Sequence, residues 1–370
     1  MTSLVVPSAV LSRARRVADA FEVFTGVNVE ADELIGGRAA LLDMAPRGRI
    51  SAGGATRLMP CRDGWCALTL SRADDVDAVP ALLGVDRVDD VWTAVQAWVA
   101  DSDAADVTER ARLLGLPVAA LAETPAEPPR VYPFGAATTT RGPADLLVAD
   151  LSAMWAGPLC GRLLARAGAT VVKVESTTRP DGARSGPRAV FDWLNTGKLS
   201  YAADFADPVS VRALLEVADV VIESSRPAAL TRRNLGGTDV APRDGRVWLR
   251  ITGHGTDGER ANWVAFGDDA AVSGGLVCGT ADDPTFCGDA IADPLTGLEA
   301  ALAVAQSLRS GGGELIEMSM AAVAATYAEQ PVSGDTACTA TPDTSAPAAE
   351  LGADNEAVDD LIARRRFAAC

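Results

Sequence analysis

The sequence is poor in lysine and histidine. Of its 33 basic residues only two are lysines, Lys173 and Lys198, and the chain contains a single histidine, His254. One imidazole excludes most Ser-His-Asp, Cys-His and histidine-rich metal mechanisms, because each of them needs at least one positioned histidine. We therefore expect the chemistry of this chain to rest on carboxylates, and we predict no metal site.

Positive charge is scarce as well. The 50 acidic residues give a net charge of −17 and a pI near 4.5, and repulsion from such a surface opposes binding to nucleic acid or to an anionic membrane. Pro7 interrupts the one stretch that resembles a signal peptide, and no apolar run is long enough to span a bilayer. The seven cysteines are scattered, which predicts free structural thiols. These features together favour a cytoplasmic protein with no nucleic-acid or membrane partner.

The 370 residues are 48% apolar, which is enough to bury a large core. A stretch rich in proline, threonine and glycine between Ala122 and Pro143 has no apolar periodicity and predicts a linker. We therefore expect a small-domain-like region over 1–125, a linker over 126–143, a large domain over 144–333, and a C-terminal arm and helix over 334–370.

The large domain begins with an alternation of strand and helix patterns. Apolar runs at 146–149 and 170–174 predict buried strands, and a helix pattern over 158–167 lies between them. Further strand patterns occur at 220–222, 247–251 and 315–320. The predicted fold class is α/β, with a Rossmann-like parallel sheet and flanking helices, plus a smaller α+β domain. The first strand–helix turn carries neither a G-x-G-x-x-G nor a P-loop motif, so no nicotinamide or P-loop nucleotide site is indicated.

Five segments of this domain follow one another in a distinctive order and spacing. They are DLSAMWAGPLCGRLLARAGATVVKVE (150–175), LNTGK (194–198), DVVIESSRP (219–227), ITGHGTDG (251–258) and GDAIADPLTGLEAA (288–301). In this order and spacing they resemble the motifs of the family III CoA-transferases, the CaiB/BaiF family, which includes formyl-CoA transferases and 2-methylacyl-CoA racemases. The resemblance covers about residues 145–330. It implies a Rossmann-like domain that takes coenzyme A and acyl-CoA as substrates and has no permanently bound cofactor.

The resemblance also implies that an aspartate is the covalent nucleophile. Asp289 and Asp293 both lie in the matching segment, but only Asp293 stands four residues before a glycine, Gly297, that leads into a long helix, as the aspartate of the family does. From the residues alone, Asp293 would be a helix N-cap, a position that keeps a carboxylate ionised. In the family, the carboxylate attacks the acyl-CoA carbonyl, and the resulting aspartyl-CoA thioester passes CoA to an acceptor carboxylic acid.

The CoA itself needs a local group of cations and amides in this acidic protein. The resemblance implies contacts from six residues: Met154, Trp155, Ala156, Lys198, Arg226 and Arg232. The sequence is equally compatible with core or surface roles for each of them. For Lys173 an ordinary structural ion pair is the better interpretation. Backbone amides would stabilise the oxyanion, with the glycines at 274, 275 and 288 as candidates.

The sequence departs from the family in two respects. The racemases use a histidine–aspartate pair, but the corresponding segment, 265–275, has Asp268 and Asp269 and no histidine. In addition, the segment that resembles the small domain of the family, about 48–122, precedes the large domain. This order indicates either a circular permutation or the second part of one unit joined to the first part of another. Members form interlaced homodimers, and we expect a homodimer here. Two alternatives stay open: an acyl-CoA isomerase or lyase with Asp268, Asp269 or Asp289 as base, and a non-catalytic acyl-CoA-binding subunit.

Overall fold

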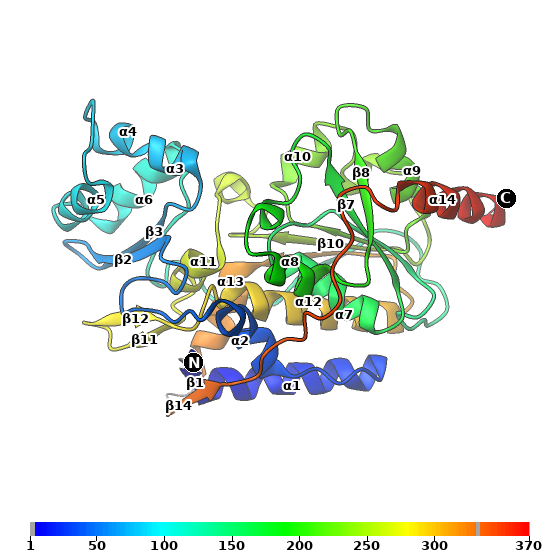
Figure 1. The fold of residues 1–370 in the computed structure, drawn as a ribbon, viewed down its shortest axis with the longest axis horizontal. Coiled ribbons are helices and arrows are strands. Elements are labelled where there is room, and N and C mark those ends of the chain that lie inside the picture. Colours follow the sequence, from blue (N-terminus) through cyan, green and yellow to red (C-terminus); the bar gives the residue numbers. More distant parts are fainter. Residues whose placement is uncertain (1–3, 331–333, 370) are drawn as a thin grey trace.

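The computed structural model describes residues 4–330 and 334–369, which form a central sheet between two layers of helices (Figure 1). The seven strands of the sheet lie in the order β5-β13-β10-β9-β6-β7-β8, and β5 alone is antiparallel to its neighbour. Their bounds are β5 Arg130–Pro133, β6 Leu147–Asp150, β7 Thr170–Ser176, β8 Leu199–Ala203, β9 Val220–Glu223, β10 Val247–Thr252 and β13 Glu314–Ser319. The expected α/β fold class is therefore confirmed.

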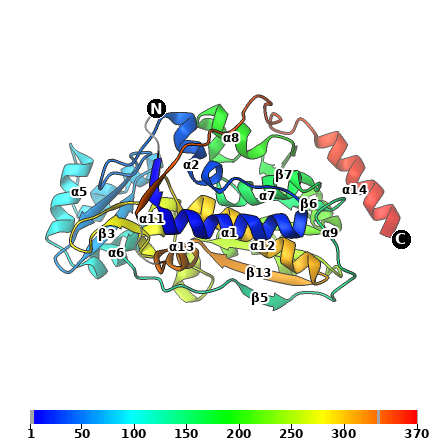
Figure 2. The same ribbon diagram turned by 90° about the horizontal axis from the view of Figure 1, so that it is seen from below.

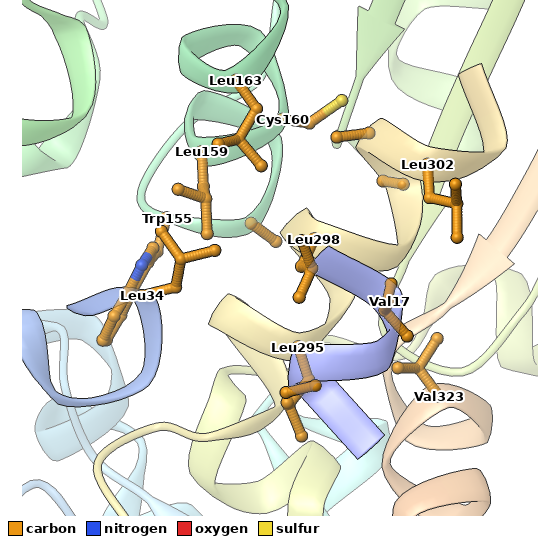
Figure 3. Close-up of a cluster of buried hydrophobic side chains, with 14 of the residues drawn as sticks. Val17, Leu34, Trp155, Leu159, Cys160, Leu163, Leu295, Leu298, Leu302 and Val323 are labelled. Carbon is orange, nitrogen blue, oxygen red and sulfur yellow. The ribbon is translucent and has the colours of Figure 1, made fainter. Parts of the chain in front are cut away.

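The central strands are apolar on both faces, because helices cover both. On one face, Val148, Ile222 and Leu249 pack against helices α1 (Ser8–Thr25), α2 (Ala31–Leu42), α7 (Ala156–Arg166), α12 (Ala292–Arg309) and α13 (Met320–Ala328). Figure 3 shows side chains of α1, α7 and α12 meeting in this cluster. On the other face, Val221 and Trp248 pack with α9 (Val209–Val217), α10 (Pro227–Thr231) and α14 (Asn355–Ala369).

The topology places a switch point at the centre of the sheet. From β6 the chain passes through α7 to β7, then through α8 (Arg188–Asn195) to β8, and α9 returns it to β9 on the opposite side of β6. β6 and β9 are adjacent strands, and the loops that follow them consequently lead in opposite directions along the sheet. In open α/β sheets, ligands bind in the crevice at such a point, outside the carboxyl ends of the strands.

A smaller α+β unit with its own core precedes the large sheet, as expected. Its antiparallel sheet consists of β2 (Thr56–Pro60), β3 (Trp65–Thr69) and β4 (Val118–Ala120). Its helices are α3 Ala73–Asp77, α4 Val79–Leu83, α5 Val91–Ala100 and α6 Ala104–Leu113. A short helix of the large unit, α11 (Gly267–Ser273), packs against β3 and β4.

The structure differs from the expected organisation in three places. Helices α1 and α2 belong to the core of the large unit, so the expected N-terminal region over 1–125 is divided between two cores (Figure 2). The expected linker contains β5, which pairs with the edge of the large sheet. The C-terminal arm begins with β14 (Asp335–Cys338), which pairs with β1 (Leu4–Pro7), and a hydrogen bond from the Ala348 amide to Asp192 (2.8 Å) then ties it to α8.

Three shorter features complete the fold. Strands β11 (Val277–Gly279) and β12 (Pro284–Phe286) form a hairpin, and 3-10 turns cover Gly182–Ser185, Gly237–Asp239 and Gly258–Asn262. Among the described residues, no helix is long and apolar enough to cross a membrane.

Candidate active site

Asp293 lies where the first turns of three helices meet. It is the second residue of α12, and its carboxylate accepts hydrogen bonds from the backbone amides of Ala156, the first residue of α7, and Gly267, the first residue of α11. A Cβ at position 267 would overlap this carboxylate, so the close approach requires glycine. The sequence suggested that Asp293 is the N-cap of its own helix, but Ile291 occupies that position. Asp293 instead satisfies amides of two other helices.

Three further aspartates surround this carboxylate. Asp289 is fully buried, and its Oδ1 lies 3.0 Å from an Nη of Arg38 on α2. Asp268 accepts a hydrogen bond from the Ala290 amide at 2.9 Å. Asp269 accepts one from the Thr69 hydroxyl at 2.7 Å. Asp293 is only half-buried, so it is the more exposed of the two aspartates that the sequence left in competition.

Burial changes the protonation of this cluster. Desolvation raises the pKa of Asp293 to about 7, although the positive charge of Arg38 and the amides of Ala156 and Gly267 oppose the rise. The same effect raises the pKa of Asp289 to about 6 and that of Asp269 to about 8. The sequence suggested a fully ionised Asp293. The structure instead gives a group that is divided between its two protonation states near neutral pH.

The loop between β6 and α7 borders the switch point of the sheet. The Leu151 amide donates to the carbonyl of Ile222 (2.8 Å), and the Ala153 amide donates to the Ser224 hydroxyl (3.1 Å), so this loop lies against the end of β9. Met154 is exposed at the tip of the loop with a left-handed φ of 70°. Its amide donates to Asp181 at 3.0 Å, which fixes this uncommon conformation.

The six expected CoA contacts divide into two groups. Met154, Arg226 and Arg232 are exposed near the switch point, and within residues 4–330 and 334–369 neither arginine has a carboxylate partner. Ala156 is buried and contributes its amide to Asp293. Trp155 and Lys198 lie in the interior and do not reach this surface.

Lys198 and Trp155 are integrated into the core. The Lys198 ammonium donates to Asp150 (2.9 Å), to the carbonyl of Pro158 (2.8 Å) and to Asn195 (3.0 Å), so all three of its protons are engaged within the protein. Trp155 is 3% exposed and forms an edge-to-face contact with Trp193. Lys198 has no proton free for CoA, and the buried ring of Trp155, whose Nε1 has no hydrogen-bond partner, does not reach the surface, so the structure differs from the contacts expected for both.

His254 lies in the loop after β10 and is 3% exposed. Burial, together with the nearby charges of Arg112 and Arg260, lowers its pKa to about 3, so the ring is neutral. Its Nδ1 lies 3.5 Å from the hydroxyl of Ser273, at the opposite end of α11 from Gly267. The histidine therefore does not face Asp293. Gly274 and Gly275 lie at that same distant end, so their amides do not reach Asp293, unlike the amide of Gly267.

The sequence gave no indication of Arg38, Thr56 or Thr69. All three precede the segments that carry the family motifs, and an arginine in a helix or a threonine in a strand has no distinguishing spacing. Only the fold brings them to the aspartate cluster, where Thr56 donates to Asp268 at 3.3 Å.

Comparison with known proteins identifies the family. The profile of CoA-transferase family III matches residues 144–353, which is more than half of the chain. The chain belongs to this family. Within it, the chain is 32% identical over 192 residues to the succinyl-CoA–D-citramalate CoA-transferase of Chloroflexus aurantiacus, covering 47% of this chain and 48% of the relative. It is 31% identical over 203 residues to the succinate–glutarate CoA-transferase of Agrobacterium fabrum, covering 48% and 50%.

Solved structures include a CAIB/BAIF family protein from Brucella suis, with 29% identity and a TM-score of 0.46, covering 51% of this chain and 55% of that one. The family III chain spans about half the length of the curated relatives that it matches.

Proposed function

We propose that this chain is a CoA-transferase that moves CoA from an acyl-CoA donor to a carboxylic acid through an aspartyl-CoA thioester on Asp293. The observation that carries the proposal is the setting of this carboxylate. It is half-buried, its ionised form accepts two backbone hydrogen bonds, and it lies in the segment 288–301, where the resemblance to the family implies the nucleophile.

The proposed reaction needs no histidine. A carboxylate oxygen of Asp293 attacks the thioester carbonyl, the C–S bond breaks, and CoA leaves as a thiolate, so that a mixed anhydride remains on the aspartate. The thiolate then attacks Cγ of Asp293 and expels the donor acid as its carboxylate. The acceptor carboxylate attacks the resulting aspartyl-CoA in the same way, and a final thiolate attack on the new acyl group releases acyl-CoA and restores the aspartate.

Each attack on Cγ of Asp293 places negative charge on its carbonyl oxygen. The amides of Ala156 and Gly267 already donate to this carboxylate, so they are available to stabilise that charge. Both amides begin helices, whose dipoles favour negative charge at the same place. This assignment replaces the glycines that the sequence suggested for the oxyanion site.

We propose that CoA binds across the switch point, with Met154 and Ala156 along one side and Arg226 and Arg232 near the phosphates. The two exposed arginines would offset the repulsion that a protein of net charge −17 exerts on this anionic substrate. The substrates are then acyl-CoA and a small carboxylic acid. By its family resemblance the enzyme is proposed to act in the cytoplasm as a homodimer.

The test is to trap the intermediate. The protein is incubated with succinyl-CoA, the donor that the names of several relatives indicate, and treated with hydroxylamine, and the modified residue is located by mass spectrometry. We expect a hydroxamate on Asp293, its loss in Asp293→Asn, and its persistence in Asp289→Asn. Adduct formation at another residue, or transfer at the wild-type rate by Asp293→Asn, would contradict the proposal. Exchange of the α-hydrogens of the acyl group without transfer would favour an isomerase. Binding of CoA thioester with neither reaction would favour a non-catalytic subunit.

A further inference from the structure

Arg38 is the cation of the aspartate cluster. It extends from α2 to Asp289, with an N–O distance of 3.0 Å, and its charge acts on Asp268, Asp289 and Asp293. Three aspartates therefore share one guanidinium in a largely buried region. Such a group of carboxylates cannot all be ionised unless positive charge compensates them.

The surroundings fix the place of this guanidinium. It stacks on the ring of Trp155 at 5.2 Å, and Trp155 immediately precedes Ala156, whose amide bonds to Asp293. The helix that carries Arg38 is held closely from behind: a Cβ at Gly37 would lie 2.7 Å from Pro342 of the C-terminal arm and 2.9 Å from Trp193. Both ends of the side chain are thus held by packing.

We propose that Arg38 is a positioning residue for Asp293: it holds Asp289 in an ion pair and supplies the positive charge that favours the ionised nucleophile. The inference rests on the proposed function of Asp293, and it assigns a role in the reaction to the N-terminal helices, which lie outside the segment matched by the family profile.

The groups that face Asp293 come from four elements. Arg38 on α2 and the amides of Ala156 on α7 and Gly267 on α11 favour the ionised form, whereas the charge of Asp268 on α11 opposes it. Asp289, in the turn before α12, neutralises part of the Arg38 charge. The charge of Asp268 also raises the pKa of Asp269. Removing Arg38 therefore takes away the strongest of the charges that favour ionisation and leaves all the opposing ones.

The experiment follows the titration of Asp293 and the trapping reaction in the same set of variants. Carboxyl carbons of ¹³C-labelled aspartate are titrated by NMR in the free protein, with Asp293→Asn used to assign the resonance. Hydroxamate formation from succinyl-CoA is measured over the same pH range. In Arg38→Met we expect both midpoints to rise by about one pH unit or more, with trapping recovering at high pH. Arg38→Lys keeps the charge, so its midpoints should stay near those of the wild type.

Asp289→Asn is the second variant, and it protects the test against misfolding. It removes an opposing carboxylate, so its midpoint should fall below that of the wild type. The double variant Arg38→Met/Asp289→Asn does not leave Asp289 buried without its cation, and its midpoint should lie above that of Asp289→Asn. A wild-type protein that forms no adduct would contradict the proposed function. A normal wild-type adduct combined with equal Asp293 midpoints in the wild type and Arg38→Met, and in Asp289→Asn and the double variant, would overturn the role of Arg38 alone.

Discussion

The ammonium of Lys198 lies 2.9 Å from Oδ2 of Asp150, and both side chains are buried. The second lysine, Lys173, is 1% exposed and pairs with Asp181 at 2.6 Å, which confirms the structural ion pair expected for it. Asp181 in turn accepts the amide of Met154. The only two lysines of the chain therefore brace the loop after β6 from inside the protein.

The geometry explains why position 198 is lysine in a chain that otherwise uses arginine. The three protons of Lys198 meet three acceptors, and a Cβ at Gly161 would lie only 3.1 Å from the ammonium. A planar guanidinium with five donors is larger and would leave some of them unsatisfied in this space. The overall composition of the chain then accounts for the absence of lysine from the surface. The presence of lysine at position 198 has a structural cause.

The first prediction concerns stability at Lys198. Lys198→Met leaves the buried charge of Asp150 without a partner, so we expect the free energy of unfolding to fall by about 3–5 kcal/mol, measured with urea. The double variant Lys198→Met/Asp150→Asn removes both charges and should recover part of this loss. If Lys198→Met were as stable as the wild type but bound CoA more weakly, the result would instead support the expected contact between Lys198 and CoA.

The second prediction concerns the exposed arginines of the switch point. We expect Arg226→Ala and Arg232→Ala each to weaken CoA binding severalfold, more at low salt than at high salt, because exposed charges act on phosphate through a screened field. Titration calorimetry at two salt concentrations measures this. Arg364→Ala is the matched control: it is also exposed, and its neighbour Arg365 bonds to Asp219 at the amino ends of the strands, opposite the switch point. Equal losses in all three variants would argue for a general field effect.

The parts of the fold that could be predicted from the sequence are those with local signals. The buried strand pattern at 146–149 and the helix that follows it correspond to β6 and α7, because continuous apolar runs and helix periodicity are properties of short segments. The strand β5 was missed inside a proline-rich linker. It has four residues, and its pairing with β13 depends on the far end of the chain.

The candidate site shows the same division. Asp293 could be found because its distance from Gly297 is fixed along the chain. Arg38 lies more than two hundred residues away and could not, because only the packing of α2 brings it to Asp289. The expected contact of Lys198 with CoA differs from the structure for a related reason. The motif LNTGK marks the residue, but only the fold shows that its side chain is buried and supports the loop beside the site.

The third prediction concerns the backbone at Met154. A left-handed conformation costs a residue with a side chain about 1–2 kcal/mol, and a β-branched residue tolerates it least. We expect Met154→Val to lower stability by about that amount and Met154→Gly to be close to neutral, since relief of strain offsets the greater entropy of the unfolded chain. Thermal unfolding measures both. Met44→Val serves as the control, because Met44 also lies in a loop but does not itself have a positive φ. Equal effects of valine at both positions would contradict the assignment of strain.

The last prediction concerns the pH dependence of stability at Asp269. Burial raises the pKa of this group from 3.8 to about 8, so between these values the folded state holds a proton that the unfolded state has lost. The resulting stabilisation is complete below pH 4 and is lost as the pH rises through about 8. His254 does not interfere above pH 7, because it is then neutral in both states.

Urea unfolding at pH 7 and pH 9 isolates this contribution. We expect the wild-type protein to lose about 1 kcal/mol from this group over the interval, since one pKa unit corresponds to about 1.4 kcal/mol. Asp269→Asn mimics the protonated carboxyl and can still accept the hydrogen bonds of Thr69 and the Phe266 amide, so its loss should be smaller by that amount. Asp63→Asn, in the exposed turn between β2 and β3, is the control and should keep the wild-type slope. The same slope in Asp269→Asn would mean that Asp269 is already ionised at pH 7 and that other groups hold the charge of the cluster.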